Sequence, residues 1–275
     1  MQQNNGIAVN NRVMARDFTL NEYKRLLATL GNAGYRFLAF EDYLSGEIVQ
    51  PSRFVILRHD IDKWASRAID VARIEKEFDA RASYYFRVVP ESNQPNIMRQ
   101  IVDMGFELGY HYEDMSICHG DAETAKAHFE RWLGYFREFY PVRTICMHGA
   151  PQSKWDSRTL WKMFNYRDWG IIGEPYFDVD FSSIFYLTDT GRRWDGHKVS
   201  VRDKIPVYQE QWVSKGWVYH TTQDIIGAAR SGALPKRIMM TTHPQRWHDT
   251  VLPWIYEYGR QQMVNAVKKH IIAKR

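Results

Sequence analysis

The chain is predicted to fold as an α/β protein, a distorted (β/α) barrel of about seven parallel strands with outer helices. Two observations predict this class. Strand-like and helix-like segments alternate along most of the sequence, and the strand-like segments are apolar at nearly every position, which is typical of strands covered on both faces. No internal repeat and no linker-like stretch divides the 275 residues, so residues 1–275 are assigned to one domain.

The first half of the chain alternates regularly. Apolar residues with helical spacing run through residues 21–37 and are followed by a glycine-rich stop and a short apolar run. The strands expected next are residues 53–58, 81–89 and 106–111. The helices expected after them are residues 65–78, 96–105 and 122–140.

The second half is less regular but keeps the same two kinds of segment. The expected strands are residues 143–148, 169–172, 182–187 and 237–243. The expected helices are residues 157–164 and 254–272. Repeated strand–helix units favour parallel pairing with helices packed outside the sheet.

Composition excludes several classes of function. The net charge of +5 comes from 37 basic and 32 acidic residues that are scattered, so no nucleic-acid-binding surface is expected. No apolar segment has the length of a signal peptide or a membrane span. Cys118 and Cys146 form no pattern, and we interpret them as reduced thiols of a cytoplasmic protein.

Ionisable residues gather where four predicted strands end. They are Arg58, His59, Asp60 and Asp62 after the first strand, His111, Glu113 and Asp114 after another, and His148 and His243 after two more. The carboxyl ends of parallel strands meet at one edge of a sheet, where α/β enzymes place their sites. A single histidine at such an end is most often structural, but four histidines together with an Asp-x-Asp pair favour a functional site.

The residue types indicate the chemistry. Asp60 and Asp62 are two residues apart, so on extended backbone they project to the same side. Two neighbouring carboxylates repel unless a cation neutralises them. One carboxylate and two imidazoles around a metal ion is a common hydrolytic arrangement. The second carboxylate could then act as a general base, and a more distant histidine could protonate the leaving group.

The segments "VILRHDID", "ARASYYFR" and "FELGYH" resemble the polysaccharide deacetylases, which have a distorted (β/α) barrel. The resemblance continues through "CMHGAPQSKWD", "TDTGRRWDG" and "TTHPQRW", and so covers Arg53 to Trp247. These segments are most similar to the WbmS-like branch, which is found with genes of O-antigen biosynthesis. The resemblance implies that Asp60 is the catalytic base, Asp62 and His111 bind the metal, and His243 is the general acid.

Two departures from the family pattern concern the metal and the base. The family's His-x-x-x-His motif has Met115 in its last position here, so the resemblance leaves one metal ligand open. His148 is preferred because a strand end is a rigid place for a ligand. The alternatives are Glu113, Asp114 and His119. The family's arginine-rich motif that steadies the base is also absent from this sequence. Arg58 could replace its arginine.

Four residues are candidates for contacts with the substrate. They are Arg58, Arg193, Trp194 and Trp247. A tryptophan can stack on a sugar ring and an arginine can hold an anionic group. The alternatives are a charged surface loop for Arg193 and Trp194, and a packing role for Trp247.

The sequence therefore predicts a metal-dependent hydrolase that removes an acyl group, N-acetyl first, from an amino sugar or saccharide precursor by cleaving a non-peptide C–N bond. Zinc is the expected metal, with nickel or cobalt as alternatives. The expected partner is a carbohydrate, nucleotide-linked or lipid-linked, in O-antigen or lipopolysaccharide biosynthesis. Two other hypotheses stay open: a metal-free amidohydrolase, and a carbohydrate-binding protein that has lost catalysis.

Overall fold

The structure is a computed structural model that describes residues 16–46, 50–195, 200 and 202–273, with side chains of the last helix described up to residue 266. Seven strands form one sheet, and every pairing in it is parallel. The strands are β1 Arg36–Leu38, β2 Phe54–Ile61, β3 Ser83–Phe86, β4 Glu107–Tyr112, β5 Ile145–Met147, β6 Phe185–Thr188 and β7 Arg237–Thr242.

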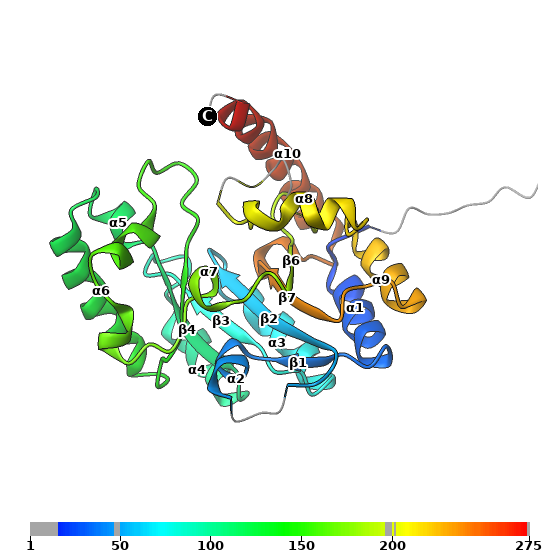
Figure 1. The fold of residues 1–275 in the computed structure, drawn as a ribbon, viewed down its shortest axis with the longest axis horizontal. Coiled ribbons are helices and arrows are strands. Elements are labelled where there is room, and N and C mark those ends of the chain that lie inside the picture. The colour runs from blue at the N-terminus through cyan, green and yellow to red at the C-terminus, as the bar shows by residue number, and fades with distance from the viewer. Residues whose placement is uncertain (1–15, 47–49, 196–199, 201, 274–275) are drawn as a thin grey trace, which may run out of the picture.

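Helices surround this sheet (Figure 1). The α-helices are α1 Leu20–Asn32, α2 Phe40–Ser45, α3 Arg67–Glu77, α4 Pro95–Asp103, α5 Asp114–Ile117, α6 Ala122–Arg137, α7 Pro175–Asp178, α8 Pro206–Ser214, α9 Thr222–Ser231 and α10 Val251–Ala273. Three short 3₁₀ helices complete the list: η1 Ser157–Lys162, η2 Tyr166–Trp169 and η3 Pro244–Arg246. None of the helices in the described part of the chain is long and apolar enough to cross a membrane.

The sheet curls into a half-barrel, as the predicted fold class requires. Its strand order is β5-β4-β3-β2-β7-β6, and β1 pairs with the first residues of β2. All eight residues of β2, the central strand, are buried, which agrees with helices covering both faces. The sheet stays open between β5 and β6, the two ends of its strand order in the described part of the chain.

Two predictions of secondary structure need correction. The expected strand at residues 169–172 does not form, because Trp169 ends η2 and Gly170 takes a left-handed conformation (φ 70°) that stops extended pairing. Only an isolated bridge between Thr144 and Gly173 remains there. The sequence pattern also does not predict the helices α2, α5, α7, α8 and α9.

Strand β2 extends three residues beyond the predicted end, and this extension positions the site. His59 and Asp60 lie within the strand, so their side chains point to opposite faces of the sheet. His59 is fully buried between Thr242 Oγ1 (2.6 Å) and Glu75 Oε1 (2.7 Å). It is therefore a hydrogen-bonded structural residue, unlike the other three strand-end histidines.

A close approach between β3 and β4 requires a glycine in the middle of the sheet. Asp60 is level with Tyr85 of β3, and Tyr85 is level with Gly109 of β4. A Cβ atom on Gly109 would lie 2.3 Å from Tyr85 Cε1. Glycine at this position lets the Tyr85 ring lie across β4 and form a hydrogen bond with Thr144 Oγ1 (2.7 Å).

Candidate functional site

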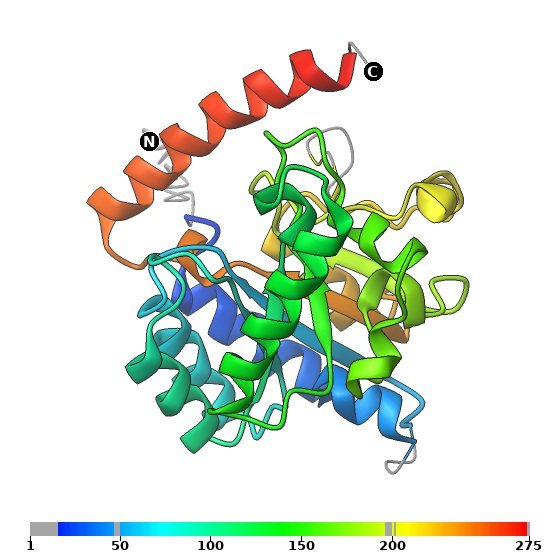
Figure 2. The same cartoon turned by 90° about the vertical axis from the view of Figure 1, so that its left-hand side faces the viewer.

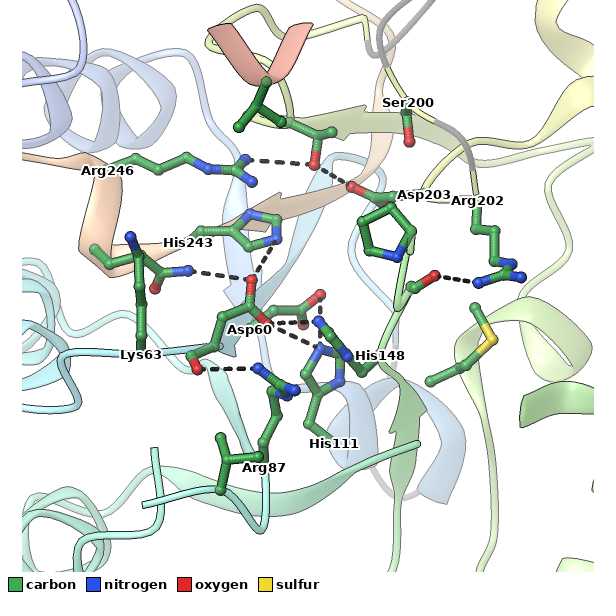
Figure 3. Close-up of a pocket in the computed structure, with 18 of the residues that line it drawn as sticks. Asp60, Lys63, Arg87, His111, His148, Ser200, Arg202, Asp203, His243 and Arg246 are labelled. Atoms are coloured by element: carbon green, nitrogen blue, oxygen red, sulfur yellow. Dashed lines mark hydrogen bonds and ion pairs between the residues drawn. The ribbon is translucent and has the colours of Figure 1, made fainter. Parts of the chain in front are cut away.

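A cavity of about 550 Å³ lies at the carboxyl ends of the strands (Figure 3). Helix α10 runs across this edge of the molecule, and its Arg260, Gln261 and Val264 contribute to the lining (Figure 2). The predicted site residues that line the cavity are Arg58, Asp60, Asp62, His111, His148 and His243. The parallel sheet thus brings together side chains from four strand ends that are far apart in the sequence.

Asp62 is the meeting point of three histidines. Its Oδ1 lies 3.6 Å from His111 Nε2 and 3.5 Å from His148 Nε2, and its Oδ2 lies 3.8 Å from His243 Nε2. Oδ1 is buried and has no hydrogen-bond partner among the described residues. Leaving a buried carboxylate oxygen without a partner costs free energy of folding, which indicates that a ligand binds to this atom.

The rings of His111 and His148 are each fixed by a hydrogen bond at Nδ1, the nitrogen that does not face Asp62. His111 Nδ1 forms a hydrogen bond with the carbonyl oxygen of Cys146 (2.9 Å), and His148 Nδ1 with Glu113 Oε2 (2.8 Å). Because Nδ1 of each ring is engaged, Nε2 of each ring is left to face Asp62. Metal-binding histidines usually have this arrangement, with an acceptor on the nitrogen that does not bind the metal.

Asp60 is held by Arg58 through two parallel hydrogen bonds. Arg58 Nε donates to Oδ1 (2.9 Å) and Nη2 donates to Oδ2 (2.7 Å). Burial acts to raise the pKa of Asp60, but the charges of Arg58, His111 and His243, together with the hydrogen bonds from Arg58, outweigh it and the pKa is lowered. Arg58 is 1% exposed and binds this carboxylate, which is the contact expected of a residue that steadies the base.

His243, directly after β7, is paired with Asp189, directly after β6. His243 Nδ1 lies 2.6 Å from Asp189 Oδ1, so its Nε2 faces the cavity. Burial and Arg246 act to lower the pKa of His243, but Asp189 and Asp62 outweigh them and the pKa is raised. The imidazole is therefore suited to be protonated near neutral pH and to donate a proton.

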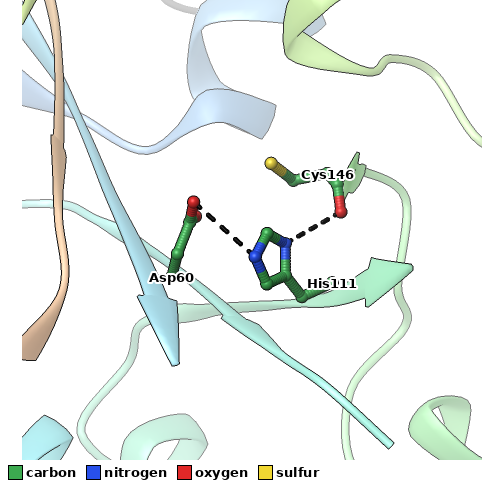
Figure 4. Close-up of side chains that lie close together, drawn as sticks. All are labelled: Asp60, His111 and Cys146. Carbon is green, nitrogen blue, oxygen red and sulfur yellow. Dashed lines mark hydrogen bonds and ion pairs between the residues drawn. The ribbon is translucent and has the colours of Figure 1, made fainter. Parts of the chain in front are cut away.

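Among the described residues, Asp60, His111 and Cys146 are the group that could hold a metal ion with one ligand atom of each within 4.8 Å of the others (Figure 4). Two features oppose metal binding there. Both oxygens of Asp60 already accept from Arg58, whose positive charge would repel a cation. Burial raises the pKa of the Cys146 thiol well above its usual value, whereas a thiol binds metal as the thiolate.

The structure separates the alternatives for the open metal ligand. His148 lines the cavity. Glu113 binds His148 and Arg87, and Asp114 is directed to His128 (2.5 Å) and Tyr110 (2.9 Å). His119 is exposed on the surface and does not line the cavity.

Three of the candidate substrate-binding residues are corrected by their positions. Arg193 does not line the cavity, because its guanidinium pairs with Asp195 (2.6 Å and 2.7 Å). Trp194 and Trp247 are fully buried, so neither ring can stack on a sugar. Trp194 Nε1 donates to Thr222 Oγ1 (3.0 Å), and Trp247 Nε1 donates to Asp189 Oδ2 (2.9 Å).

Three side chains hold the site together in roles that the sequence pattern does not predict, although Glu113 is an alternative metal ligand by sequence and Asp189 belongs to the segment "TDTGRRWDG", a candidate for a sugar contact. Asp189 orients His243, Glu113 orients His148, and Gln245 donates from Nε2 to Asp62 Oδ2 (3.2 Å). Asp189 could have been found, because it follows an apolar strand in the same way as His148 and His243 do. Gln245 carries no such signal, since its role depends on the turn of η3.

No protein-family model, no curated protein and no solved structure matches this chain in the comparisons made with each. The resemblance to polysaccharide deacetylases therefore remains a prediction from the sequence.

Proposed function

We propose that this chain is a metal-dependent hydrolase that removes an N-acyl group from an amino sugar, as the resemblance to polysaccharide deacetylases implies. Asp62, His111 and His148 would hold the metal, Asp60 would be the general base and His243 the general acid. The observation that carries the proposal is the buried Oδ1 of Asp62, which lacks a hydrogen-bond partner in the described part of the chain and faces two oriented imidazoles.

Two of the three separations among these ligand atoms suit a divalent cation. Two ligand atoms that bind one ion in tetrahedral geometry at about 2 Å are themselves about 3.3 Å apart. Asp62 Oδ1 lies 3.6 Å and 3.5 Å from the two Nε2 atoms, close to that separation. The single carboxylate and the two nitrogens suit zinc, with nickel or cobalt as alternatives. When bound, such an ion supplies a Lewis acid that polarises an acyl carbonyl and lowers the pKa of water.

Asp60 is placed to take a proton from the attacking water. Its Oδ2 lies 3.7 Å from His111 Nε2, which puts it beside the proposed metal ligands. The bidentate contact with Arg58 keeps the carboxylate ionised and fixes its direction. Arg58 also excludes Asp60 from the ligand set, which separates the roles of the two aspartates.

His243 is placed to give a proton to the departing amine. Asp189 engages Nδ1 and thereby presents Nε2 to the cavity. The raised pKa of His243 favours the protonated imidazole that a general acid needs. In this proposal the base is on β2 and the acid directly follows β7.

The test is the metal content of protein purified without added metal or chelator, measured by plasma mass spectrometry. We expect about one metal per chain, lost in His148→Ala and kept in His119→Ala, a variant of an exposed histidine outside the cavity. Protein without metal, even after incubation with zinc, nickel or cobalt, would refute the proposal. The metal-free and carbohydrate-binding hypotheses would then have to be tested.

A further inference from the structure

Lys63 lines the cavity directly after the proposed metal ligand Asp62 (Figure 3). Its Nζ lies 4.0 Å from the centre of the Trp64 ring. Within the described part of the chain, its only ion pair is with Glu257 Oε2 at 3.8 Å, which is too long for a hydrogen bond. The ammonium therefore has donors without an acceptor, and 26% of the side chain is exposed to reach a ligand.

The carboxylate nearest to Lys63 is already engaged. Both oxygens of Glu257 accept from Arg260, at 2.8 Å each. Arg246 also lines the cavity, and its Nη1 donates to Asp189 Oδ1 (2.7 Å). These three cations come from different parts of the chain: Lys63 follows β2, Arg246 is in η3 and Arg260 is in α10. The carboxylates that they contact are those of Glu257 and Asp189.

Glu257 is shared by two of these cations. Arg260 donates to both of its oxygens (2.8 Å each), and Lys63 Nζ lies 3.8 Å from Oε2. An anion bound beside Lys63 would offer its ammonium a charged hydrogen-bond acceptor.

Asp62 and Glu91 also line the cavity, and two further carboxylates of its lining have partners of their own. Asp60 is bound by Arg58. Asp203 accepts from the hydroxyl groups of Thr188 (2.6 Å) and Thr190 (2.5 Å). Neither forms an ion pair with Lys63 in the described part of the chain, so neither replaces an anionic ligand.

We propose that Lys63, with Arg246 and Arg260, forms a phosphate subsite, and that the substrate is an amino sugar carrying a phosphoryl group. This inference rests on the proposed function and adds the substrate class to it. A lysine ammonium and the forks of two arginines offer the several charged donors that phosphoryl oxygens accept. In an amino-sugar 1-phosphate the phosphate and the acylated nitrogen are on neighbouring carbons. Lys63 and Asp62 both line the cavity, so one ligand bound in it can contact both.

The experiment is isothermal titration calorimetry with N-acetylglucosamine 1-phosphate and N-acetylglucosamine. We expect the phosphorylated sugar to bind wild-type protein about 10- to 100-fold more tightly, the range for hydrogen bonds to charged groups. Lys63→Met should remove most of this preference. Lys215→Met should keep it, because Lys215 lies over a tryptophan ring in the same way (4.8 Å) but outside the cavity.

Equal affinities for the two sugars, no binding of either, or an unchanged preference in Lys63→Met would overturn the inference. If Lys63→Met does not fold by circular dichroism, Lys63→Gln and the charge-preserving Lys63→Arg replace it, and only Lys63→Arg should keep the preference. Turnover separates the two proposals. Preferential binding without hydrolysis of either sugar would support the subsite and count against the hydrolase, and equal hydrolysis of both sugars would do the reverse.

Discussion

His148 Nδ1 lies 2.8 Å from Glu113 Oε2, and the other nitrogen of the same ring lies 3.5 Å from Asp62 Oδ1. Glu113 is itself fixed by Arg87 Nε, which donates to its other oxygen (2.7 Å). A chain of contacts from Arg87 to Asp62 thus sets the direction of the imidazole. The position that the family motif leaves open after His111 is taken over, in this proposal, by a histidine from another strand.

Replacing Glu113 with alanine should weaken metal binding about 10- to 100-fold, the usual effect of losing the acceptor behind a metal-binding histidine. Without Glu113 the ring of His148 can rotate and present either nitrogen to Asp62. The measurement is the zinc affinity of the purified variant by competition with a chromogenic chelator. Glu91→Ala is the control, since Glu91 lines the cavity but pairs with no histidine in the described part of the chain. Equal affinities in both variants would contradict the prediction.

The proposed ligand set and the group Asp60, His111 and Cys146 predict opposite effects of three substitutions, at Asp62, Asp60 and Cys146, while both require His111. If Asp62, His111 and His148 are the ligands, Asp62→Ala and His111→Ala should abolish metal retention, while Cys146→Ala and Asp60→Asn should keep it. The physical reason is that Asp60 already accepts hydrogen bonds from Arg58, and that burial raises the pKa of the Cys146 thiol. Metal content, measured by plasma mass spectrometry, distinguishes the two sets of ligands. Full occupancy in Asp62→Ala, or loss of metal in Cys146→Ala, would show that the ligands are assigned wrongly.

His243→Ala should keep the metal and lose turnover, because His243 acts on the leaving group in the proposed mechanism. Asp189→Asn should reduce kcat by about 10²- to 10⁴-fold, the range for general acid–base catalysis, again with the metal kept. Asparagine removes the charge that favours the protonated imidazole, and its neutral amide oxygen is a weaker acceptor for the hydrogen bond from Nδ1. Metal content and kcat for an N-acetylated sugar are measured on the same samples. An Asp189→Asn enzyme with wild-type kcat would remove Asp189 from the mechanism.

Much of the fold follows from the sequence because strands covered on both faces are mostly apolar. The segment 53–58 shows this pattern at positions 54–57 and forms β2, whereas the segments 106–111 and 237–243 mix polar with apolar residues and form β4 and β7. The segment 169–172 also has a short apolar run, but there Gly170 turns the chain instead. A four-residue pattern carries too little information to decide between a strand and a turn.

The residues at the centre of the site could be predicted because strand ends in a parallel sheet converge. Asp60, Asp62, His111, His148 and His243 all line the cavity. The residues around them could not be predicted, because burial and direction depend on the whole packing. Trp194 and Trp247 are typical of sugar-binding sites by residue type, but the fold buries both rings beside Phe18.

Glu107, at the start of β4, should make the protein less stable as the pH rises from about 4.5 to about 7. This carboxyl is 1% exposed and accepts from Ser83, Thr144 and the backbone of Glu41. Burial, with the charge of Glu41, raises the pKa of Glu107 from 4.5 to about 7. Between these values the folded state keeps a proton that the unfolded state has lost, so stability falls with pH, by about 3 kcal/mol in total.

Glu107→Gln should remove this part of the pH dependence, because glutamine stays neutral at every pH. Urea unfolding at pH 5 and pH 8 measures the effect. The wild-type free energy of unfolding should fall by about 3 kcal/mol more than that of the variant between these two pH values. Glu138→Gln, at an exposed position, should follow the wild type. Parallel curves for wild type and Glu107→Gln would mean that Glu107 is ionised in the folded protein at both pH values.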